Sequence, residues 1–151
     1  FMICVSMGYP TVEEEMEIMR RSQAEDRTEG IVPVLDAPTL LEMIRDAREI
    51  FMHDKICRYI AELAKATREN EWTELGLSPR GTVALTAMAK ACAYLKGRAY
   101  VVPSDVEEVF PCVAAHRIIL NMKAKVGHIK VEETIRQILE NTEKPAIRNR
   151  R

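Results

Sequence analysis

The stretch Leu77-Ser78-Pro79-Arg80-Gly81 opens an alanine-rich run that continues to about Leu95, and it decides the fold class. Ser78 is a good N-cap because its hydroxyl can accept a hydrogen bond from a free N–H of the first turn. Pro79 suits the first helical position, where no N–H is needed. We therefore expect a helix from Pro79 to about Lys96, and its alanines permit the close approach of a central helix.

Arg80 stands out within this helix because it falls in the first turn, at the positive end of the helix dipole. That end is unfavourable for a cation. A helix N-terminus with an arginine beside it is, however, a geometry that binds anions. The residue alone leaves two interpretations open, a solvated surface arginine and a phosphate-binding arginine.

The other helix starts are marked by capping patterns. Thr11 to Glu14, Thr39 to Glu42 and Ser104 to Glu107 each have the sequence of a capping box. Pro111 is expected to end the helix that the last of these begins. With the central helix, the expected helices cover residues 12–24, 39–48, 53–70, 79–96, 104–110, 113–122 and 131–141.

Apolar spacing indicates which faces of these helices are buried. In the 53–70 helix the expected stripe is Ile56, Tyr59, Ile60, Leu63 and Ala64, and in the central helix it is Val83, Ala84, Ala87, Met88, Ala91 and Leu95. Short extended pieces are expected near residues 2–7, 31–35, 50–52 and 97–103. The predicted fold is an all-α helical bundle with two or three short extended segments.

Composition excludes several functions. The net charge of −1 argues against a dedicated nucleic-acid binder. No apolar run is long enough to span a membrane. The dispersed histidines and cysteines show no metal-ligand spacing, so no metal site is expected. Cys57, Cys92 and Cys112 are expected to be small buried residues.

Motifs for complete catalysis are also absent from the sequence. There is no phosphate-binding loop of the Gly-x-x-x-x-Gly-Lys-[Ser/Thr] type and no apolar strand ending in paired acidic residues. No catalytic Ser/His/Asp or Cys/His set can be recognised in the sequence. The 151 residues by themselves are not expected to form an enzyme.

Several blocks taken together resemble one family, the C-terminal lid of MoxR-type AAA+ ATPases. They occur in the family's order and spacing: Thr67-Arg68-Glu69, Gly76 to Gly81, Gly97-Arg98 with Tyr100, Val101, Pro103, Asp105 and Val106, and His116-Arg117-Ile118. The opening Met7-Gly8-Tyr9-Pro10, followed by Glu14, Glu15 and Glu17, resembles the family's segment around the last strand of the ATPase core. Two positions depart from the family pattern, because Leu77 replaces a small residue and Gly81 replaces a common alanine.

The resemblance implies a division of the chain into three parts. Residues 1–10 would be the last strand of the AAA+ core and the hinge, 11–35 a connecting helix and linker, and 36–151 the helical lid domain. The nucleotide-binding core would precede Phe1. A strand separated from its sheet has unpaired edges, so we expect residues 2–5 to be disordered, refolded or paired with another chain.

The resemblance also implies roles for particular residues. Arg80 matches the sensor 2 arginine, which approaches the terminal phosphate of ATP and serves catalysis. Tyr9 and Pro10 would lie near the adenine, so the cofactor-binding residues would be Arg80, Tyr9 and Pro10. ATP and Mg²⁺ would be bound mainly by the core. Asp105 is expected to support the capping turn at Ser104, and Arg98 and Tyr100 to pack a loop on a helix.

The implied activity belongs to a longer protein. The family's ATP hydrolysis would drive chaperone-like remodelling or maturation of partner proteins by a cytoplasmic homo-oligomer, often a hexamer, with a von Willebrand factor A domain protein as one partner. Two alternatives remain open from the sequence: a stand-alone helical protein-interaction module with no nucleotide role, and a helix-turn-helix DNA-binding domain. The net charge and the core-like central helix disfavour the second alternative.

Overall fold

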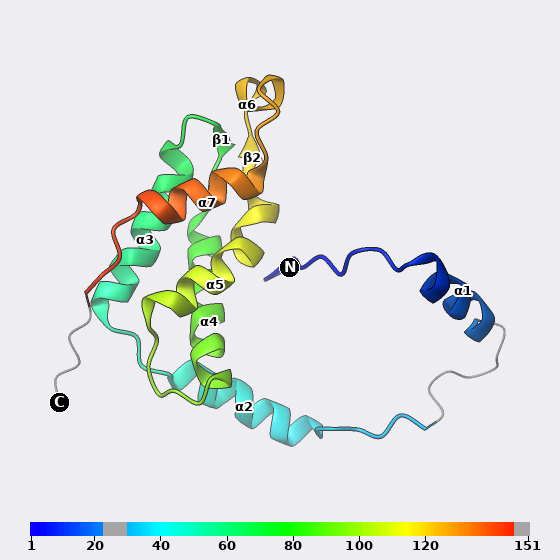
Figure 1. Cartoon of the computed structure of the whole chain (residues 1–151). Coiled ribbons are helices and arrows are strands. Elements are labelled where there is room, and N and C mark those ends of the chain that lie inside the picture. The colour runs from blue at the N-terminus through cyan, green and yellow to red at the C-terminus, as the bar shows by residue number, and fades with distance from the viewer. Residues whose placement is uncertain (23–29, 147–151) are drawn as a thin grey trace.

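The structure, a computed structural model, describes residues 1–22 and 30–146. Helices dominate it and strands are few (Figure 1), so the predicted all-α class is confirmed. The helices are α1 (Val12–Arg21), α2 (Ala37–Glu49), α3 (Asp54–Glu69), α4 (Pro79–Leu95), α5 (Pro103–Ala114), the 3₁₀ turn η1 (Ala115–Arg117), α6 (Met122–Val126) and α7 (Val131–Asn141). Within the described residues, no helix combines the length and apolar character needed to cross a membrane.

The core is built by α3, α4, α5 and α7, which pack their apolar faces together. The predicted stripe of α3 is confirmed, since Ile56, Tyr59, Ile60, Leu63 and Ala64 are all buried. From α5 and α7 come Val106, Phe110, Val113, Ile135 and Ile138. Burial of these large side chains is the main source of stability.

The central helix α4 buries a different stripe from the one predicted. Val83 and Leu95 are exposed, and the buried residues are Gly81, Leu85, Ala89, Cys92 and Ala93. An alanine-rich helix is weakly apolar all round, so its periodicity does not define one face. The helix α4 contacts α5 most extensively, then α2 and α3, and the small residues of its buried stripe allow this close packing.

Two of the three predicted capping boxes are wrong. The box of Thr11 and Glu14 is present at the start of α1. The helix α2 starts earlier than predicted, because Asp36 is its N-cap and accepts a 2.8 Å hydrogen bond from the Thr39 N–H. At α5 the helix starts at Pro103, so Ser104 lies inside the first turn and does not cap.

The region around Pro111 also differs from the prediction. The helix α5 continues through Pro111 to Ala114. The proline removes only one helical N–H bond, and its ring is exposed to solvent, so the helix tolerates it near its end. The predicted 113–122 helix is replaced by η1, the strand β2 (Ile119–Leu120) and α6.

Two strand contacts tie the loops to the bundle. β1 (Thr73–Leu75) pairs antiparallel with β2, with Thr73 opposite Leu120. Phe51 and Tyr100 form an isolated parallel bridge, in which the Phe51 N–H donates to the Ala99 carbonyl at 3.0 Å. The expected extended pieces near 50–52 and 97–103 are therefore present.

The N-terminal part lies outside this core. Figure 1 shows α1 standing apart from the bundle, and α1 buries none of its residues. Residues 1–10 contain no strand; the first four lie against the end of α5, and the chain then leads away from the bundle to α1 (Figure 1). The predicted continuation of α1 to Ala24 and part of the expected 25–35 linker lie outside the described residues.

Candidate functional site

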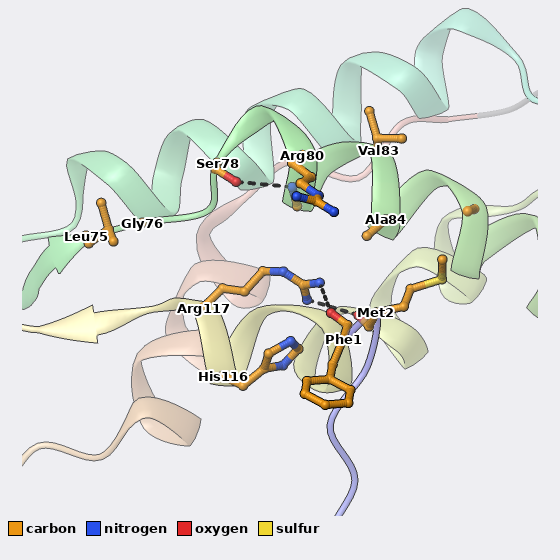
Figure 2. A pocket seen from close by; sticks show the side chains of 12 residues that line it. Phe1, Met2, Leu75, Gly76, Ser78, Arg80, Val83, Ala84, His116 and Arg117 are labelled. Carbon is orange, nitrogen blue, oxygen red and sulfur yellow. Dashed lines mark hydrogen bonds between the residues drawn. The ribbon is translucent and has the colours of Figure 1, made fainter.

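A cleft of about 720 Å³ lies at the start of α4. Figure 2 shows Arg80 on the α4 side of this cleft, with Arg117, His116 and Phe1 on the other side. The cleft is lined by Phe1, Met2, Leu75, Gly76, Ser78, Arg80, Gly81, Val83, Ala84, Ala87, His116 and Arg117. Segments from three distant parts of the sequence therefore meet around the N-terminus of α4.

The local sequence places Arg80 in the first turn of α4, as predicted. The Ser78 hydroxyl accepts a hydrogen bond of 3.3 Å from the Gly81 N–H, and Pro79 occupies the first helical position. The first turn contains no acidic residue. Arg80 is exposed, and within residues 1–22 and 30–146 its side chain makes no hydrogen bond or ion pair. The Arg80 guanidinium, at the positive end of the α4 dipole, is thus available to an anion at this point.

The last turn of α3 holds the segment that leads into Arg80. The buried Thr67 hydroxyl accepts a 2.8 Å hydrogen bond from the Leu77 N–H and donates to the Ala64 carbonyl at 2.7 Å. The Nε of Arg68 donates to the Leu77 carbonyl at 2.7 Å. Both main-chain groups of Leu77 are therefore bound by α3. These bonds join the Thr67-Arg68 block of the motif to the Gly76-Leu77 segment.

Two glycines make this arrangement possible by close approach. A Cβ on Gly76 would lie 2.6 Å from the Arg68 backbone nitrogen and 2.7 Å from the Thr67 carbonyl carbon. Real Cβ atoms essentially never approach backbone so closely. Gly81 faces the Leu77 side chain, which is completely buried. Gly76 lets the chain cross α3, and Gly81 leaves room for Leu77.

Arg117 was not singled out by the sequence as part of this cleft. Its guanidinium donates to the Phe1 carbonyl at 2.6 Å, to the Met2 carbonyl at 3.0 Å and to the Val113 carbonyl. His116 lines the same cleft and is exposed. The His116-Arg117 block of the motif was the available signal, but without the fold nothing in the sequence connects it to Ser78 and Arg80.

The motif blocks that build this cleft also carry the likeness to known proteins. Residues 65–138 match the sequence model of the AAA lid domain. Over nearly its full length, the chain aligns with chaperone MoxR1 of Mycobacterium tuberculosis at 32% identity. The chain carries an AAA lid domain of the MoxR family.

Other relatives agree with this assignment. The uncharacterised protein YeaC of Bacillus subtilis is 32% identical over 149 residues. The crystal structure of a candidate ATPase from Cytophaga hutchinsonii superposes with a TM-score of 0.82 at 29% identity, covering 97% of the chain. The chain spans 47% of YeaC, 41% of MoxR1 and 47% of the Cytophaga protein, so it corresponds to about half the length of its relatives.

The Arg98 and Asp105 blocks of the lid domain form an ion pair away from the cleft. Asp105 is buried, and its carboxylate accepts from Arg98 Nη1 at 2.7 Å and from the Val102 N–H at 2.9 Å, with a second bond from Arg98 Nη2. Burial acts to raise the Asp105 pKa, but the bonds from Arg98 and Val102 outweigh it and hold the pKa below its ordinary value. The predicted structural roles of Arg98 and Asp105 are confirmed. The turn that Asp105 supports, however, starts at Val102 and not at Ser104.

Tyr9 and Pro10 lie beside α1 in the lid structure. They line a separate shallow hollow with Gly8, Glu13 and Glu14, and Tyr9 is fully exposed. The described residues do not bring them into the Arg80 cleft. Their role near a nucleotide stays a prediction.

Cysteine placement corrects one expectation. Cys92 is buried and Cys112 is half-buried, but Cys57 is exposed on α3. Its neighbours Ile56, Tyr59 and Ile60 point into the core, so position 57 falls on the opposite face of the helix. The part of the chain described holds no group of three or more His, Cys, Asp or Glu side chains that could bind a metal ion.

Proposed function

We propose that the chain is the lid of a MoxR-type AAA+ ATPase and that Arg80 is its sensor 2 arginine. One observation carries this proposal: Arg80 is an exposed guanidinium at the N-terminus of α4, with no bonding partner of its own among the described residues. A cation at the positive end of the helix dipole is unfavourable, so α4 by itself would be more stable without Arg80. An arginine here is useful when an anion approaches from another domain.

The partner domain in this proposal is an ATPase core that binds ATP and Mg²⁺ through its own phosphate loop. Arg80 would stabilise charge on the transferring phosphoryl group and report the nucleotide state by tying lid to core. Tyr9 and Pro10 would form the hinge next to the adenine. The clamp of α3 on Leu77 supports this role, because a residue that meets a transition state must be held rigidly.

The proposed oligomeric state and remodelling activity are based on the relatives rather than on the lid itself. Two of the matched proteins are called MoxR and one is called a chaperone. We extend this to a homo-oligomeric ring, with six subunits expected, which remodels or matures partner proteins. A von Willebrand factor A domain protein is the partner that the family suggests.

The test is ATP turnover by the full-length protein carrying Arg80→Ala. Loss of an arginine that stabilises a phosphoryl transition state should lower kcat by at least about a hundredfold. Arg80→Lys should restore part of the rate. Arg136→Ala, at an exposed position of α7, is the matched control and should leave kcat unchanged. Unchanged hydrolysis in Arg80→Ala would overturn the sensor 2 assignment.

The interaction-module alternative is supported by the uncovered apolar residues of α2. Leu40, Leu41 and Ile44 are all substantially exposed, and α2 buries none of its residues. A contiguous exposed apolar face is typical of a contact surface. The two functions differ in their dependence on Arg80, since a module that only binds proteins would keep its partner affinity in the Arg80→Ala variant whether or not ATP is present.

A further inference from the structure

The first four residues are attached to the far end of α5 although they form no strand. The Cys4 N–H donates to the Cys112 carbonyl at 2.9 Å. The carbonyls of Phe1 and Met2 accept from Arg117. Three hydrogen bonds therefore join residues 1–4, which we call the N-terminal strap, to residues 112–117. Phe1 and Met2 at the same time line the Arg80 cleft.

The strap binds at the end of α5 because carbonyl groups are free there. A helix leaves its last four carbonyls without intrahelical partners. Here the chain tightens into η1, and the Ala114 carbonyl is taken by the Ile118 N–H. The Cys112 carbonyl is bonded by Cys4, and the Val113 carbonyl is bonded by Arg117. The strap and the guanidinium thus replace the next helical turn.

Arg117 connects these two parts with one rigid group. Its Nη1 reaches both the Val113 and Met2 carbonyls, and its Nη2 reaches the Phe1 carbonyl. The stem of the same side chain packs beside α4, where its Cδ would lie 3.2 Å from a Cβ on Gly81. One residue therefore contacts the strap, α5 and the first turn of α4.

We infer that Arg117 is a positioning residue: it clamps the N-terminal strap onto α5 and so fixes one wall of the cleft into which Arg80 faces. The effect on nucleotide rests on the proposed function of Arg80. The clamp itself does not, because it is defined by hydrogen bonds within the described residues. A failure of the sensor 2 assignment would leave the strap measurements below unaffected.

The geometry requires arginine rather than any cation. The planar guanidinium presents five donors in a fixed arrangement and can bridge several carbonyls at once. Lysine has one ammonium on a flexible stem, so it can reach one carbonyl of the strap but cannot bridge the Phe1, Met2 and Val113 carbonyls together. Glutamine retains a short donor and loses the charge. Arg117→Lys should therefore hold the strap partly, and Arg117→Gln should release it.

Amide hydrogen exchange of the 151-residue chain, read by NMR, tests the clamp. In the unmodified chain the Cys4 amide should exchange about tenfold more slowly than the Ser6 amide, which has no main-chain acceptor among the described residues. Arg117→Gln should bring the Cys4 rate to that of Ser6, and Arg117→Lys should give an intermediate rate. Arg136→Gln is the matched arginine control and should leave the Cys4 rate unchanged.

The Ala89 amide separates a clamp from a general loss of stability. Ala89 is completely buried in α4. A variant that only destabilised the fold would accelerate exchange at both Cys4 and Ala89, whereas release of the clamp accelerates Cys4 alone. Equal Cys4 and Ser6 rates in the unmodified chain, or an unchanged Cys4 rate in Arg117→Gln, would overturn the inference.

A second variant covers the case in which Arg117→Gln does not fold. Cys4→Pro removes the donor to Cys112 at an exposed position and leaves Arg117 intact. Backbone heteronuclear NOE values at Met2 should stay close to those of the unmodified chain, because the two bonds from Arg117 to Phe1 and Met2 remain. A fall of the Met2 value to that of a free chain end would show that Arg117 does not hold the strap.

Discussion

The Leu77 side chain occupies the space that a Cβ on Gly81 would need. An ideal Cβ at position 81 would lie 2.5 Å from Leu77 Cδ1 and 2.8 Å from Leu77 Cγ. Leu77 is completely buried, so it has no free space into which to move. The two departures of this chain from the family pattern are therefore one feature, in which a larger residue at 77 is matched by a smaller residue at 81.

Gly81→Ala should destabilise the chain even though alanine is the better helix former. Overpacking a filled core costs about 1–3 kcal/mol, more than the gain in helix propensity of up to about 1 kcal/mol. Leu77→Ala should cost about 2–5 kcal/mol through the cavity it leaves. Together the two changes should cost less than their sum by at least about 0.5 kcal/mol. Urea unfolding of the unmodified chain, the two single variants and the double variant measures this coupling. Strict additivity of the two costs would contradict it.

Gly76→Ala should be more damaging than Gly81→Ala. The new Cβ would meet backbone atoms of Thr67 and Arg68, which cannot rotate away as a side chain can. We expect a loss of at least about 3 kcal/mol in the free energy of unfolding, because relief of the clash would break the bonds from α3 to Leu77. Gly127→Ala is the control, since its nearest contact would be an ordinary 3.4 Å. Similar stabilities for the two variants would refute this account.

Thr67→Val should leave the Leu77 N–H buried without an acceptor. Valine has nearly the shape of threonine, so the change isolates the hydroxyl. The expected cost is about 1–3 kcal/mol of stability, the penalty for an unsatisfied buried donor. Thr67→Ser keeps the hydroxyl and should retain most of the hydrogen bonding while losing only a methyl group. Thermal unfolding of both variants decides the matter, and a valine variant as stable as the serine variant would exclude a role for this bond.

The buried pair of Arg98 and Asp105 should make the fold sensitive to acid. The pKa of Asp105 is lowered in the folded chain, so the unfolded chain binds its proton more readily. The stability from this group is fully present above the unfolded pKa of about 3.9 and is lost as the pH falls through the lower folded value. Asp105→Asn should remove this part of the pH dependence between about pH 2 and 5, measured by unfolding across that range.

Arg98→Ala should cost more stability at neutral pH than an exposed arginine would. It leaves a buried carboxylate with the Val102 N–H, the Cys92 thiol and the Lys96 ammonium at 3.4 Å as its remaining polar partners. Breaking one side of a buried ion pair costs about 3–5 kcal/mol. Arg136→Ala on α7 is the comparison and should change the free energy of unfolding by less than about 0.5 kcal/mol. Equal stabilities of the two variants would show that the pair contributes nothing.

Strong local signals made much of the fold predictable. Ser78-Pro79 fixed the start of α4, and the bounds of α7 were predicted as residues 131–141, as found. The apolar period of α3 was also sufficient, since its large side chains define a single face. These elements have caps or periodicities that need no information from elsewhere in the chain.

The sequence predictions are wrong where an element depends on a residue far away in the chain, or where two residues could serve equally well as a helix cap. The Thr39 to Glu42 pattern predicts the wrong cap for α2, because Asp36 can also cap and only the backbone conformation decides between two nearby polar residues. The short strand β2 forms because β1 is available to pair with it. The first residues of the two strands, Thr73 and Ile119, are forty-six positions apart in the sequence. Propensity alone favours a continued helix through that region.

The candidate site was predictable only in part for the same reason. Arg80 was evident because its place at a helix start is a local feature. Arg117 was not, since its contacts with Phe1 and Met2 join residues separated by more than a hundred positions. The clamp of Thr67 and Arg68 on Leu77 lies between these extremes, visible as motif blocks but without a physical reason until α3 and α4 are packed together.

The fit between Leu77 and Gly81 limits how residues can be exchanged at these two positions. Leucine at 77 in a chain with alanine at 81 would meet the alanine Cβ, and this overpacking would cost about 1–3 kcal/mol. The residue that position 77 tolerates therefore depends on the residue at position 81, and a redesign of this helix start has to choose the two together.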